Sequence, residues 1–424
     1  MAGKDRSVAR RLGRREFLQG AGAMAAGVAA MKPLFTIAAE AAKGANGKPG
    51  IGFIGCGGRS GAHMGIVHAL STQGKCQAVA VCDVYGPRAK AAGERTGGTK
   101  VYRHHKELLA DPNVDIVCIA TPDRLHAPQA IDAVRAGKDV YVEKPLTHWS
   151  QFPLARQLAE ETEKHKRVVT VGTQGMCDDG YWQVRELIQQ GAIGKIIHAQ
   201  AGYFRKGDWG EAGMPVPDPN AKPGPDLDWE AFLGDAPKVD FDVSRFFRWR
   251  LYWDYAGGPC TDVLVHTFTP VFVMLGVDYP ERVTGNGGRW QYAPPREVPD
   301  TFNLTIDYPG GPSVVLMSTF SNPYGVPPVI RGTNGVVTFE GNKLLVRPEG
   351  AKEPSHSVPV RGWGDAGDTG KLWLNFLECV KTRQKPLSPV DVGARVQAPL
   401  NMSILSFRES KFARFDAQKQ EIVL

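Results

Sequence analysis

The chain has 424 residues, of which 42% are hydrophobic and 22% charged, as expected of a soluble globular protein with two domains. The formal net charge is +7, but residues 1–42 hold seven Lys/Arg and three Asp/Glu, so the remainder carries +3, which argues against nucleic-acid binding. The seven cysteines form no CxxC pair, so we predict neither a disulfide framework nor a metal centre. No apolar run is long enough to cross a bilayer.

Residues 1–42 have the features of a targeting segment. They contain "GRREFLQ" (13–19), a weakly apolar run rich in Ala and Gly (20–31), and small residues at 39–41 that suit cleavage. The segment resembles a twin-arginine export signal, although the first and last residues of 13–19 depart from the usual pattern. It predicts export to the periplasm in folded form by the twin-arginine machinery. An amphipathic arm that stays attached is the alternative.

A glycine-rich turn follows an apolar strand pattern at 50–55. It reads "GCGGRSG" (55–61), which is G-x-G-x-x-G with Ser60 in place of the third glycine. Glycines permit the tight turn and let backbone N–H groups approach a pyrophosphate at the N-terminus of a helix, here expected at 62–70. The turn therefore predicts a dinucleotide site, and its expected cofactor contacts are Gly55, Gly57, Gly58, Arg59 and Ser60.

The next strand pattern, "CQAVAVCD" (76–83), ends in Asp83, about twenty residues after the glycines. An acid at that place can hydrogen-bond the ribose 2′-hydroxyl and repels a 2′-phosphate, so the pattern favours NAD. Arg59 and Arg88 are near enough in the sequence to leave NADP open. A solvated acid at the end of a strand is the alternative interpretation of Asp83.

Strand and helix patterns then alternate up to residue 172. Strands are expected at 114–121, 139–145 and 167–172, and helices at 127–137 and 153–165. Such alternation predicts an α/β fold with a doubly wound parallel sheet. Ligands bind at the carboxyl ends of the strands in such sheets, and the residues at those ends include Thr121, Pro122, Glu143 and Lys144.

Several motifs resemble one family. "TPDRLH" (121–126), "AGK" (136–138) and "EKP" (143–145) are followed by "VGTQ" (171–174), "GAIGKI" (191–196) and "GGPCTDVLVH" (257–266). Over most of residues 50–410 the chain resembles the glucose–fructose oxidoreductase, inositol dehydrogenase and rhizopine-catabolism (Gfo/Idh/MocA) family. The resemblance implies cofactor contacts from Thr121, Pro122, His126, Glu143 and Lys144.

The resemblance also implies a domain organisation. After the targeting segment, an NAD(P)-binding Rossmann domain is expected at 43–172. An α/β domain with a large, mostly antiparallel sheet follows at 173–424, and the exposed face of that sheet is expected to form a homo-oligomer. Strand patterns occur there at 196–204, 301–308, 313–320 and 335–341, and helical patterns at 371–382 and 392–407.

Three residues are expected to carry the chemistry. Hydride transfer from a hydroxyl requires a base for its proton and a positive group near its oxygen. Lys144 stands at a strand end before Pro145, and the resemblance implies that it reaches both nicotinamide and substrate. Asp262 and His266 are four residues apart, so one helix would place them on one face as a proton relay, with His266 as acid/base. The alternatives are a surface lysine and an ordinary helix pair.

Two loops rich in aromatic and polar residues, 203–220 and 246–258, flank the expected cleft. Aromatic faces can stack on sugar rings, and charged side chains can bind hydroxyls, whereas simple loop packing is the alternative. The residues chosen as substrate contacts are Gln174, Trp182, Arg205, Arg250 and Tyr255.

An exported enzyme would meet little free NAD(H), so we expect a tightly bound cofactor that is regenerated in each cycle. The expected reaction is hydride transfer at a hydroxyl of a sugar, glycoside or cyclitol. An NAD-dependent glycosidase or lyase that works by oxidation and elimination is one alternative, and a non-catalytic sugar-binding or sensor protein is another. The stretch at 257–266 differs from that of the exported N-acetylgalactosaminidase branch, which disfavours that particular activity.

Overall fold

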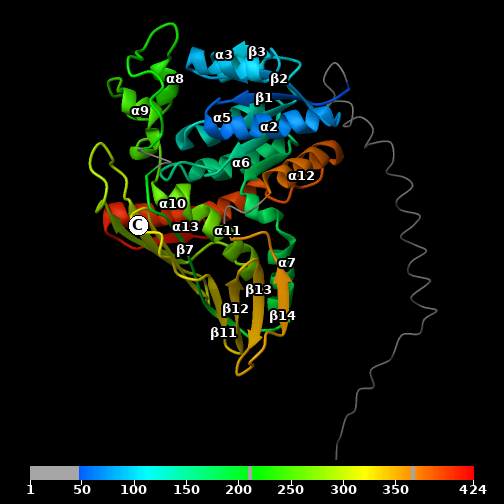
Figure 1. The fold of residues 1–424 in the computed structure, drawn as a ribbon, viewed down its shortest axis with the longest axis vertical. Coiled ribbons are helices and arrows are strands. Elements are labelled where there is room, and N and C mark those ends of the chain that lie inside the picture. The colour runs from blue at the N-terminus through cyan, green and yellow to red at the C-terminus, as the bar shows by residue number, and fades with distance from the viewer. Residues whose placement is uncertain (1–46, 209–212, 364–367) are drawn as a thin grey trace, which may run out of the picture. The chain divides into compact units, whose positions relative to one another are not determined.

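The computed structural model describes residues 47–208, 213–363 and 368–424, which form two sheets with helices packed on them (Figure 1). The segment expected to direct export, residues 1–42, lies outside the described residues. Within these ranges, no helix is both long enough and apolar enough to span a membrane.

The first sheet has six parallel strands in the order β3-β2-β1-β4-β5-β6. They are β1 (Gly50–Ile54), β2 (Gln77–Cys82), β3 (Lys100–Tyr102), β4 (Ile116–Ile119), β5 (Asp139–Glu143) and β6 (Val169–Gly172). The connecting helices are α2 (Gly58–Thr72), α3 (Gly86–Arg95), α4 (His105–Leu109), α5 (Asp123–Arg135) and α6 (Pro153–Lys164). The predicted doubly wound parallel sheet is confirmed, and the strand order reverses between β1 and β4, where such folds bind ligands.

The second sheet has ten strands in the order β14-β13-β12-β11-β7-β10-β9-β8-β15-β16. Only the β7–β10 pair is parallel among its described pairings, so the predicted mostly antiparallel sheet is confirmed. Its strands are β7 (Ile196–Phe204), β8 (Arg282–Gly288), β9 (Thr301–Asp307), β10 (Ser313–Thr319), β11 (Val329–Gly332), β12 (Gly335–Glu340), β13 (Lys343–Pro348), β14 (His356–Pro359), β15 (Ala413–Asp416) and β16 (Glu421–Val423).

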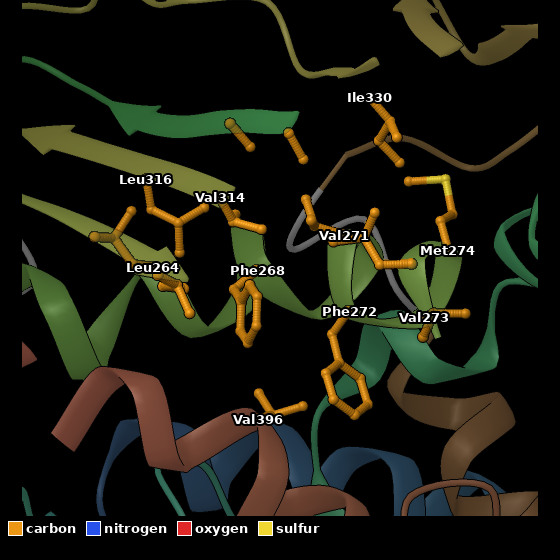
Figure 2. Close-up of a cluster of buried hydrophobic side chains, with 14 of the residues drawn as sticks. Leu264, Phe268, Val271, Phe272, Val273, Met274, Val314, Leu316, Ile330 and Val396 are labelled. Atoms are coloured by element: carbon orange, nitrogen blue, oxygen red, sulfur yellow. The ribbon is translucent and has the colours of Figure 1, made fainter. Parts of the chain in front are cut away.

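The hydrophobic core beside the second sheet lies around one apolar helix, α11 (Leu264–Leu275). Figure 2 shows Val314 and Leu316 of β10 on one side of this helix and Val396 on the other side. The remaining helical segments are η2 (Gln174–Cys177), α7 (Asp179–Gln189), α8 (Trp229–Leu233), α9 (Val243–Phe247), η3 (Trp249–Leu251), α10 (Pro259–Asp262), α12 (Thr369–Thr382) and α13 (Val390–Glu409). Because α11 is apolar nearly all round, it is buried between the sheet and α13.

Residues near the C-terminal end of the chain pack against the first sheet. Arg383, just after α12, forms hydrogen bonds of 2.8 and 2.9 Å with the carboxylate of Asp139 in β5. The N–H of Val171 in β6 donates to the carbonyl of Ser388 at 2.8 Å. The segment around α12 therefore packs on the edge of the first sheet, beside β6 (Figure 1).

Several elements differ from their predicted bounds. Helix α2 begins at Gly58 rather than at 62, and α5 begins at Asp123 rather than at 127, so the residues after each turn belong to the first helical turn. The expected strands of the second sheet form, but six further strands join them, including β8, which contains three glycines. A Cβ at Gly285 of β8 would collide with the Ser403 carbonyl of α13, so close helix packing explains a strand that β-propensity alone does not predict.

Candidate active site

A cavity of about 920 Å³ opens at the carboxyl ends of β1, β2, β4 and β5. Its volume suits a ligand larger than a single sugar. Of the predicted cofactor contacts, these line it: Gly55, Gly57, Gly58, Arg59, Asp83, Thr121, Pro122, His126, Glu143 and Lys144. Ser60 does not line the cavity; it belongs to the first turn of α2 and is fully buried, as close packing between helix and sheet requires at the third glycine position.

The glycine-rich turn leaves room for a ligand. Gly55 has a φ of +80°, and a Cβ there would lie 2.8 Å from the methyl group of Thr121, so glycine lets β1 end close against β4. A Cβ at Gly57 or Gly58 would meet nothing within 4 Å. Helix α2 starts at Gly58 and has no side-chain cap, so its first N–H groups can bind an anion such as a pyrophosphate.

Asp83 fixes the geometry at the end of β2. Its carboxylate accepts hydrogen bonds from the N–H groups of Cys56, at 2.8 Å, and Tyr85, at 2.9 Å. Arg88 lies 3.7 Å from the same carboxylate and also lines the cavity. The acid thus ties the glycine-rich turn to the next loop, and its negative charge is placed where it opposes a 2′-phosphate.

Glu143 is the centre of a buried ionic cluster beside the cavity. Its Oε1 lies 2.8 Å from Nη2 of Arg59 and accepts from Nε2 of His63 at 2.9 Å. The indole N–H of Trp373 in α12 donates to Nδ1 of His63 at 2.9 Å, so the proton on the neutral ring must sit on Nε2 and point at Glu143. Burial raises the pKa of Glu143, but the charge of Arg59 and the bond from His63 outweigh it and hold the pKa well below its usual range.

Lys144 belongs to a second cluster, which faces the cavity. Its Nζ donates to the carbonyl oxygen of Asp262 at 2.6 Å and lies 3.1 Å from Oδ1 of the same residue. Nε of Arg250 lies 3.4 Å from that Oδ1, and the Arg250 guanidinium stacks on the ring of Trp249. Burial raises the pKa of Asp262, but the two cations reverse that effect and lower it below its usual range.

The predicted single helix through Asp262 and His266 is wrong. Helix α10 ends at Asp262 and α11 begins at Leu264, with a break at Val263. The N–H of His266 consequently donates to Val263 rather than to Asp262, which leaves the Asp262 carbonyl for Lys144. His266 does not line the cavity. It is half-buried and lies near enough to Asp262 to lower the pKa of that carboxyl.

His126 joins two strand ends. Its Nδ1 lies 2.7 Å from the carbonyl oxygen of Pro145, and its Nε2 lies 2.8 Å from that of Thr121. The ring therefore holds the turn that carries Lys144 against the end of β4. This contact explains why a histidine stands five residues after Thr121.

Of the five predicted substrate contacts, only Arg250 lines the cavity. Tyr255 is 1% exposed and packs in an aromatic core, 5.3 Å from Phe232 between ring centroids. Gln174 is buried beside Glu143, with its amide nitrogen 3.4 Å from that carboxylate. The prediction fails for Tyr255 because loop aromatics that could stack on a sugar find protein partners instead.

Trp182 and Arg205 also have protein partners. The indole N–H of Trp182 donates to the carbonyl of Met176 at 3.0 Å, and its ring packs against the core around α11. The guanidinium of Arg205 lies 3.9 Å above the ring centroid of Phe320. Neither side chain lines the cavity.

Asp123 lines the cavity but was not predicted from the sequence. It is the first residue of α5, is 4% exposed and lines the cavity. Burial raises the pKa of its carboxyl to about 7, although the charge of Arg250 opposes this. Its place directly after Thr121 and Pro122, at the end of a strand, could have indicated a site residue. The helix was expected to start at 127, whereas α5 starts at Asp123 and brings this residue to the cavity.

This fold and site define a dinucleotide-binding oxidoreductase. Residues 50–173 match the Gfo/Idh/MocA oxidoreductase family profile, described as an NAD-binding Rossmann fold, and residues 181–424 match the C-terminal alpha/beta domain of the same family. The chain belongs to this family of NAD-binding oxidoreductases, which includes cyclitol dehydrogenases.

Known relatives differ in how much of the chain they match. An inositol 2-dehydrogenase of Salmonella typhimurium is 33% identical over 127 residues, which cover 29% of this chain and only 38% of that enzyme. A glycosyl hydrolase family 109 protein of Shewanella pealeana is 25% identical over 393 residues, which cover 80% of this chain and 77% of that protein.

Solved structures share the fold. Levoglucosan dehydrogenase in complex with NADH superposes with a TM-score of 0.65 at 19% identity. The superposition covers 86% of this chain and 98% of that enzyme. The WlbA dehydrogenase of Bordetella pertussis, in complex with NADH and UDP-GlcNAcA, superposes with a TM-score of 0.64 at 19% identity. The superposition covers 87% of this chain and 99% of that dehydrogenase.

Proposed function

We propose that this protein is a dehydrogenase that oxidises a hydroxyl group of a sugar or cyclitol with NAD. The observation that carries the proposal is the position of Lys144. It lines the same cavity as the glycine-rich turn, and its ammonium group is held by both the carbonyl and the carboxylate of Asp262. A cation fixed beside a dinucleotide site is what the oxygen of a reacting carbinol requires.

The residues fit a dinucleotide. Gly57 and Gly58 offer open space and unpaired helix N–H groups for a pyrophosphate, and Asp83 suits a ribose without a 2′-phosphate. When bound, NAD supplies the hydride acceptor. Lys144 then donates a hydrogen bond to the substrate oxygen, while Asp262 orients the lysine. Arg250 lines the cavity beside them and is placed to bind further hydroxyls.

The relatives support the substrate class. The Salmonella relative is an inositol 2-dehydrogenase, although the match spans less than half of it. Two structures with the same fold are a levoglucosan dehydrogenase and a dehydrogenase with bound UDP-GlcNAcA. All three act on or bind a ring that carries several hydroxyls, so we extend that class to this chain.

A second candidate is an oxidation–elimination reaction on a glycoside. The Shewanella relative, a glycosyl hydrolase family 109 protein, matches four fifths of this chain. Such a reaction would use the same Lys144 cluster first to oxidise a hydroxyl and later to return the hydride. A non-catalytic sugar-binding role is less well supported, because it would not need Lys144 to be held by Asp262.

We further propose that the protein is exported and keeps its cofactor. Residues 1–42 resemble a twin-arginine signal, which would carry the folded enzyme to the periplasm. Because free NAD(H) is expected to be scarce there, the cofactor would be bound tightly and regenerated within each cycle. Assembly into a homo-oligomer through the open face of the second sheet is part of the same proposal.

The first experiment is to purify the full chain without added nucleotide, denature it, and measure NAD(H) and NADP(H) per chain. Near-stoichiometric NAD(H) would support a resident cofactor. Little nucleotide would overturn that part of the proposal and indicate exchange with external NAD. Turnover is then tested with myo-inositol, levoglucosan and aryl glycosides, with and without NAD. Failure on every hydroxyl substrate in the presence of NAD would contradict the dehydrogenase assignment.

Export is tested separately by cell fractionation of the intact chain and of a variant with Arg14→Lys and Arg15→Lys. We expect the intact chain in the periplasm and the variant in the cytoplasm. If both forms stay in the cytoplasm, the export proposal is wrong, and the dehydrogenase assignment is unaffected.

A further inference from the structure

Residues 213–255 form a small unit, which we call the cap. It contains α8, α9 and η3 and lies beside the first sheet, next to α3 (Figure 1). Its buried side chains, among them Phe232, Phe246 and Leu251, form a hydrophobic cluster separate from those beside the two sheets. Because the cap has a core of its own, it can keep its internal structure while its contacts with the first sheet open and close.

The side chain of Tyr85 enters the core of the cap. Tyr85 lies between β2 and α3 and is 8% exposed. Its ring centroid lies 5.8 Å from that of Phe246 and 5.5 Å from that of Phe247, both in edge-on contact. A residue that belongs to the first sheet therefore anchors the cap through aromatic packing.

The main chain joins the cap to the first sheet at the same place. The N–H groups of Gly86 and Asp228 donate across this junction at 2.8 and 3.0 Å. They flank Tyr85 and Leu227, which face each other as an isolated antiparallel pair. In a pair flanked in this way, the two Cα atoms lie about 4.5 Å apart.

The other contacts between the cap and the first sheet are polar. Arg103, after β3, donates to the carbonyl groups of Gly224 and Pro225 at 2.9 and 2.8 Å, and its side chain is 40% exposed. Gln151 donates to the carboxylate of Asp235 at 2.7 Å. Partly exposed contacts of this kind each contribute little stability, so the cap can separate from the first sheet without unfolding it.

The cap also supplies part of the cavity wall, at both ends of the dinucleotide site. At the end marked by Asp83, the Arg88 guanidinium lies 3.7 Å from that carboxylate and 5.7 Å from the ring centroid of Phe247. At the other end, Arg250 of the cap lines the cavity together with Lys144. A dinucleotide that runs from Asp83 to Lys144 would therefore be enclosed by the first sheet and the cap.

We propose that the cap closes over the bound dinucleotide and sets the rate at which the cofactor leaves. The inference rests on the proposed function, because it requires NAD in this cavity, and it gives the proposed retention of the cofactor a physical basis. Before the nucleotide can leave, the Tyr85 ring must withdraw from the core of the cap and the two main-chain hydrogen bonds beside it must break. Opening of the cap is then the slow step of release.

The first test measures how fast NADH leaves the full chain. Protein loaded with NADH is mixed with a large excess of NAD, and the loss of energy transfer from tryptophan to NADH gives the release rate. We expect Tyr85→Ala, which removes the anchoring ring, to release NADH at least about 10-fold faster than wild type. Tyr85 does not line the cavity, so the variant keeps the residues that surround the ligand. If Tyr85→Ala does not fold, Tyr85→Leu takes its place.

The matched control is Tyr279→Ala. Tyr279 is also held by aromatic packing, with its ring centroid 4.2 Å from that of Phe415, but it neither belongs to the cap nor lines the cavity. This variant should release NADH at the wild-type rate. The inference is overturned if Tyr85→Ala releases NADH no faster than wild type, or if both variants release it equally fast.

A disulfide tests the junction in the opposite direction. The expected Cα separation of Tyr85 and Leu227, about 4.5 Å, is within the range that disulfides span. In the double variant Tyr85→Cys, Leu227→Cys, oxidation with glutathione disulfide should lock the cap, and NADH should leave at least about 10-fold more slowly than after reduction. Mass spectrometry verifies the bond. Wild type given the same reagents is the control, since its seven cysteines are buried and free.

The outcomes distinguish this inference from the proposed function. If wild type binds no NADH, the dinucleotide site fails, and the proposed function fails with it. If wild type binds NADH but the oxidised and reduced forms of the double variant release it equally fast, the cap does not control release. The inference about the cap is then wrong, while the dehydrogenase assignment stands.

Discussion

Two neighbouring residues, Glu143 and Lys144, lead to two charged clusters with opposite properties. The carboxylate of Glu143 is 3% exposed and meets Arg59 and His63, and His63 in turn meets Trp373. The ammonium of Lys144 meets Asp262 and opens to the cavity with Asp123 and Arg250. We call these the Glu143 cluster and the Lys144 cluster.

The clusters differ in whether every charged group has a partner within the protein. In the Glu143 cluster each charge has a partner within the protein, so the cluster can stabilise the fold, although Arg59 and Glu143 also line the cavity. The Lys144 cluster includes a carboxyl group, Asp123, that lacks an ion-pair partner among the described residues, and it borders open space. Completed clusters therefore serve structure, and incomplete clusters beside a cavity serve chemistry.

The largest effect should come from the Lys144 cluster. Lys144→Ala removes the cation that holds the substrate oxygen, so we expect kcat/KM to fall by about 10³-fold or more. NAD bound per chain should stay close to wild type. The control is Lys371→Ala, which breaks a lysine–aspartate pair at the surface. Normal activity of Lys144→Ala would mean that the Lys144 cluster is not the reactive one.

The Glu143 cluster should respond in stability. Glu143→Gln leaves the Arg59 guanidinium, which is 36% exposed, beside a neutral amide, and we expect the free energy of unfolding at pH 7 to fall by about 1.5–3 kcal/mol. Urea unfolding measures it. Glu161→Gln is the control, because Glu161 also pairs with an arginine and a histidine, but at the surface, and its effect should be far smaller. Equal losses in the two variants would contradict a special role for the buried cluster.

The pH dependence of the same variant sharpens the test. The folded pKa of Glu143 lies below its ordinary value of 4.5, so its contribution to stability is present above about pH 4.5 and is lost as pH falls further. Wild type should therefore lose its advantage over Glu143→Gln in urea unfolding at acid pH. An advantage that stays constant down to about pH 3 would place the effect in packing instead of ionisation.

The stability contribution of Asp123 should change with pH in the opposite direction to that of Glu143. Its folded pKa is raised from 3.8 to about 7, so the folded state holds a proton that the unfolded chain releases, and stability falls as pH rises between those values. Asp123→Asn removes this loss and should be more stable than wild type at pH 8, by about 2–4 kcal/mol. Asp179→Asn, at a side chain that is 77% exposed, should not differ from wild type. Thermal or urea unfolding at pH 5 and pH 8 provides the comparison.

The smallest effect is expected at the edge of the Glu143 cluster. Trp373→Phe keeps an aromatic ring at this position but removes the hydrogen bond to Nδ1 of His63 and part of the buried volume; the lost hydrogen bond alone should cost about 1–2 kcal/mol of stability. Trp290→Phe, at a side chain that is 71% exposed, is the control and should cost almost nothing. No loss in Trp373→Phe would mean that α12 does not orient His63.

The sequence by itself determined the nucleotide-binding half. The glycine-rich turn, Asp83 and Lys144 could each be placed because a strand, a turn and a helix follow one another within a few residues. A parallel sheet then brings all the carboxyl ends of its strands to one edge. Local pattern and sheet topology suffice for such residues, and the fold class of both sheets follows from the same patterns and the family motifs.

Only the tertiary structure decided which side chains complete each cluster. Trp373 reaches His63 across 310 positions of sequence, the break at Val263 gives the Asp262 carbonyl to Lys144, and Tyr255 is buried where the loop pattern predicts a sugar contact. Asp123 becomes significant only when Arg250 and Asp262 face it. These contacts depend on how distant segments pack, and neither hydrophobic periodicity nor motif spacing specifies a partner hundreds of residues away.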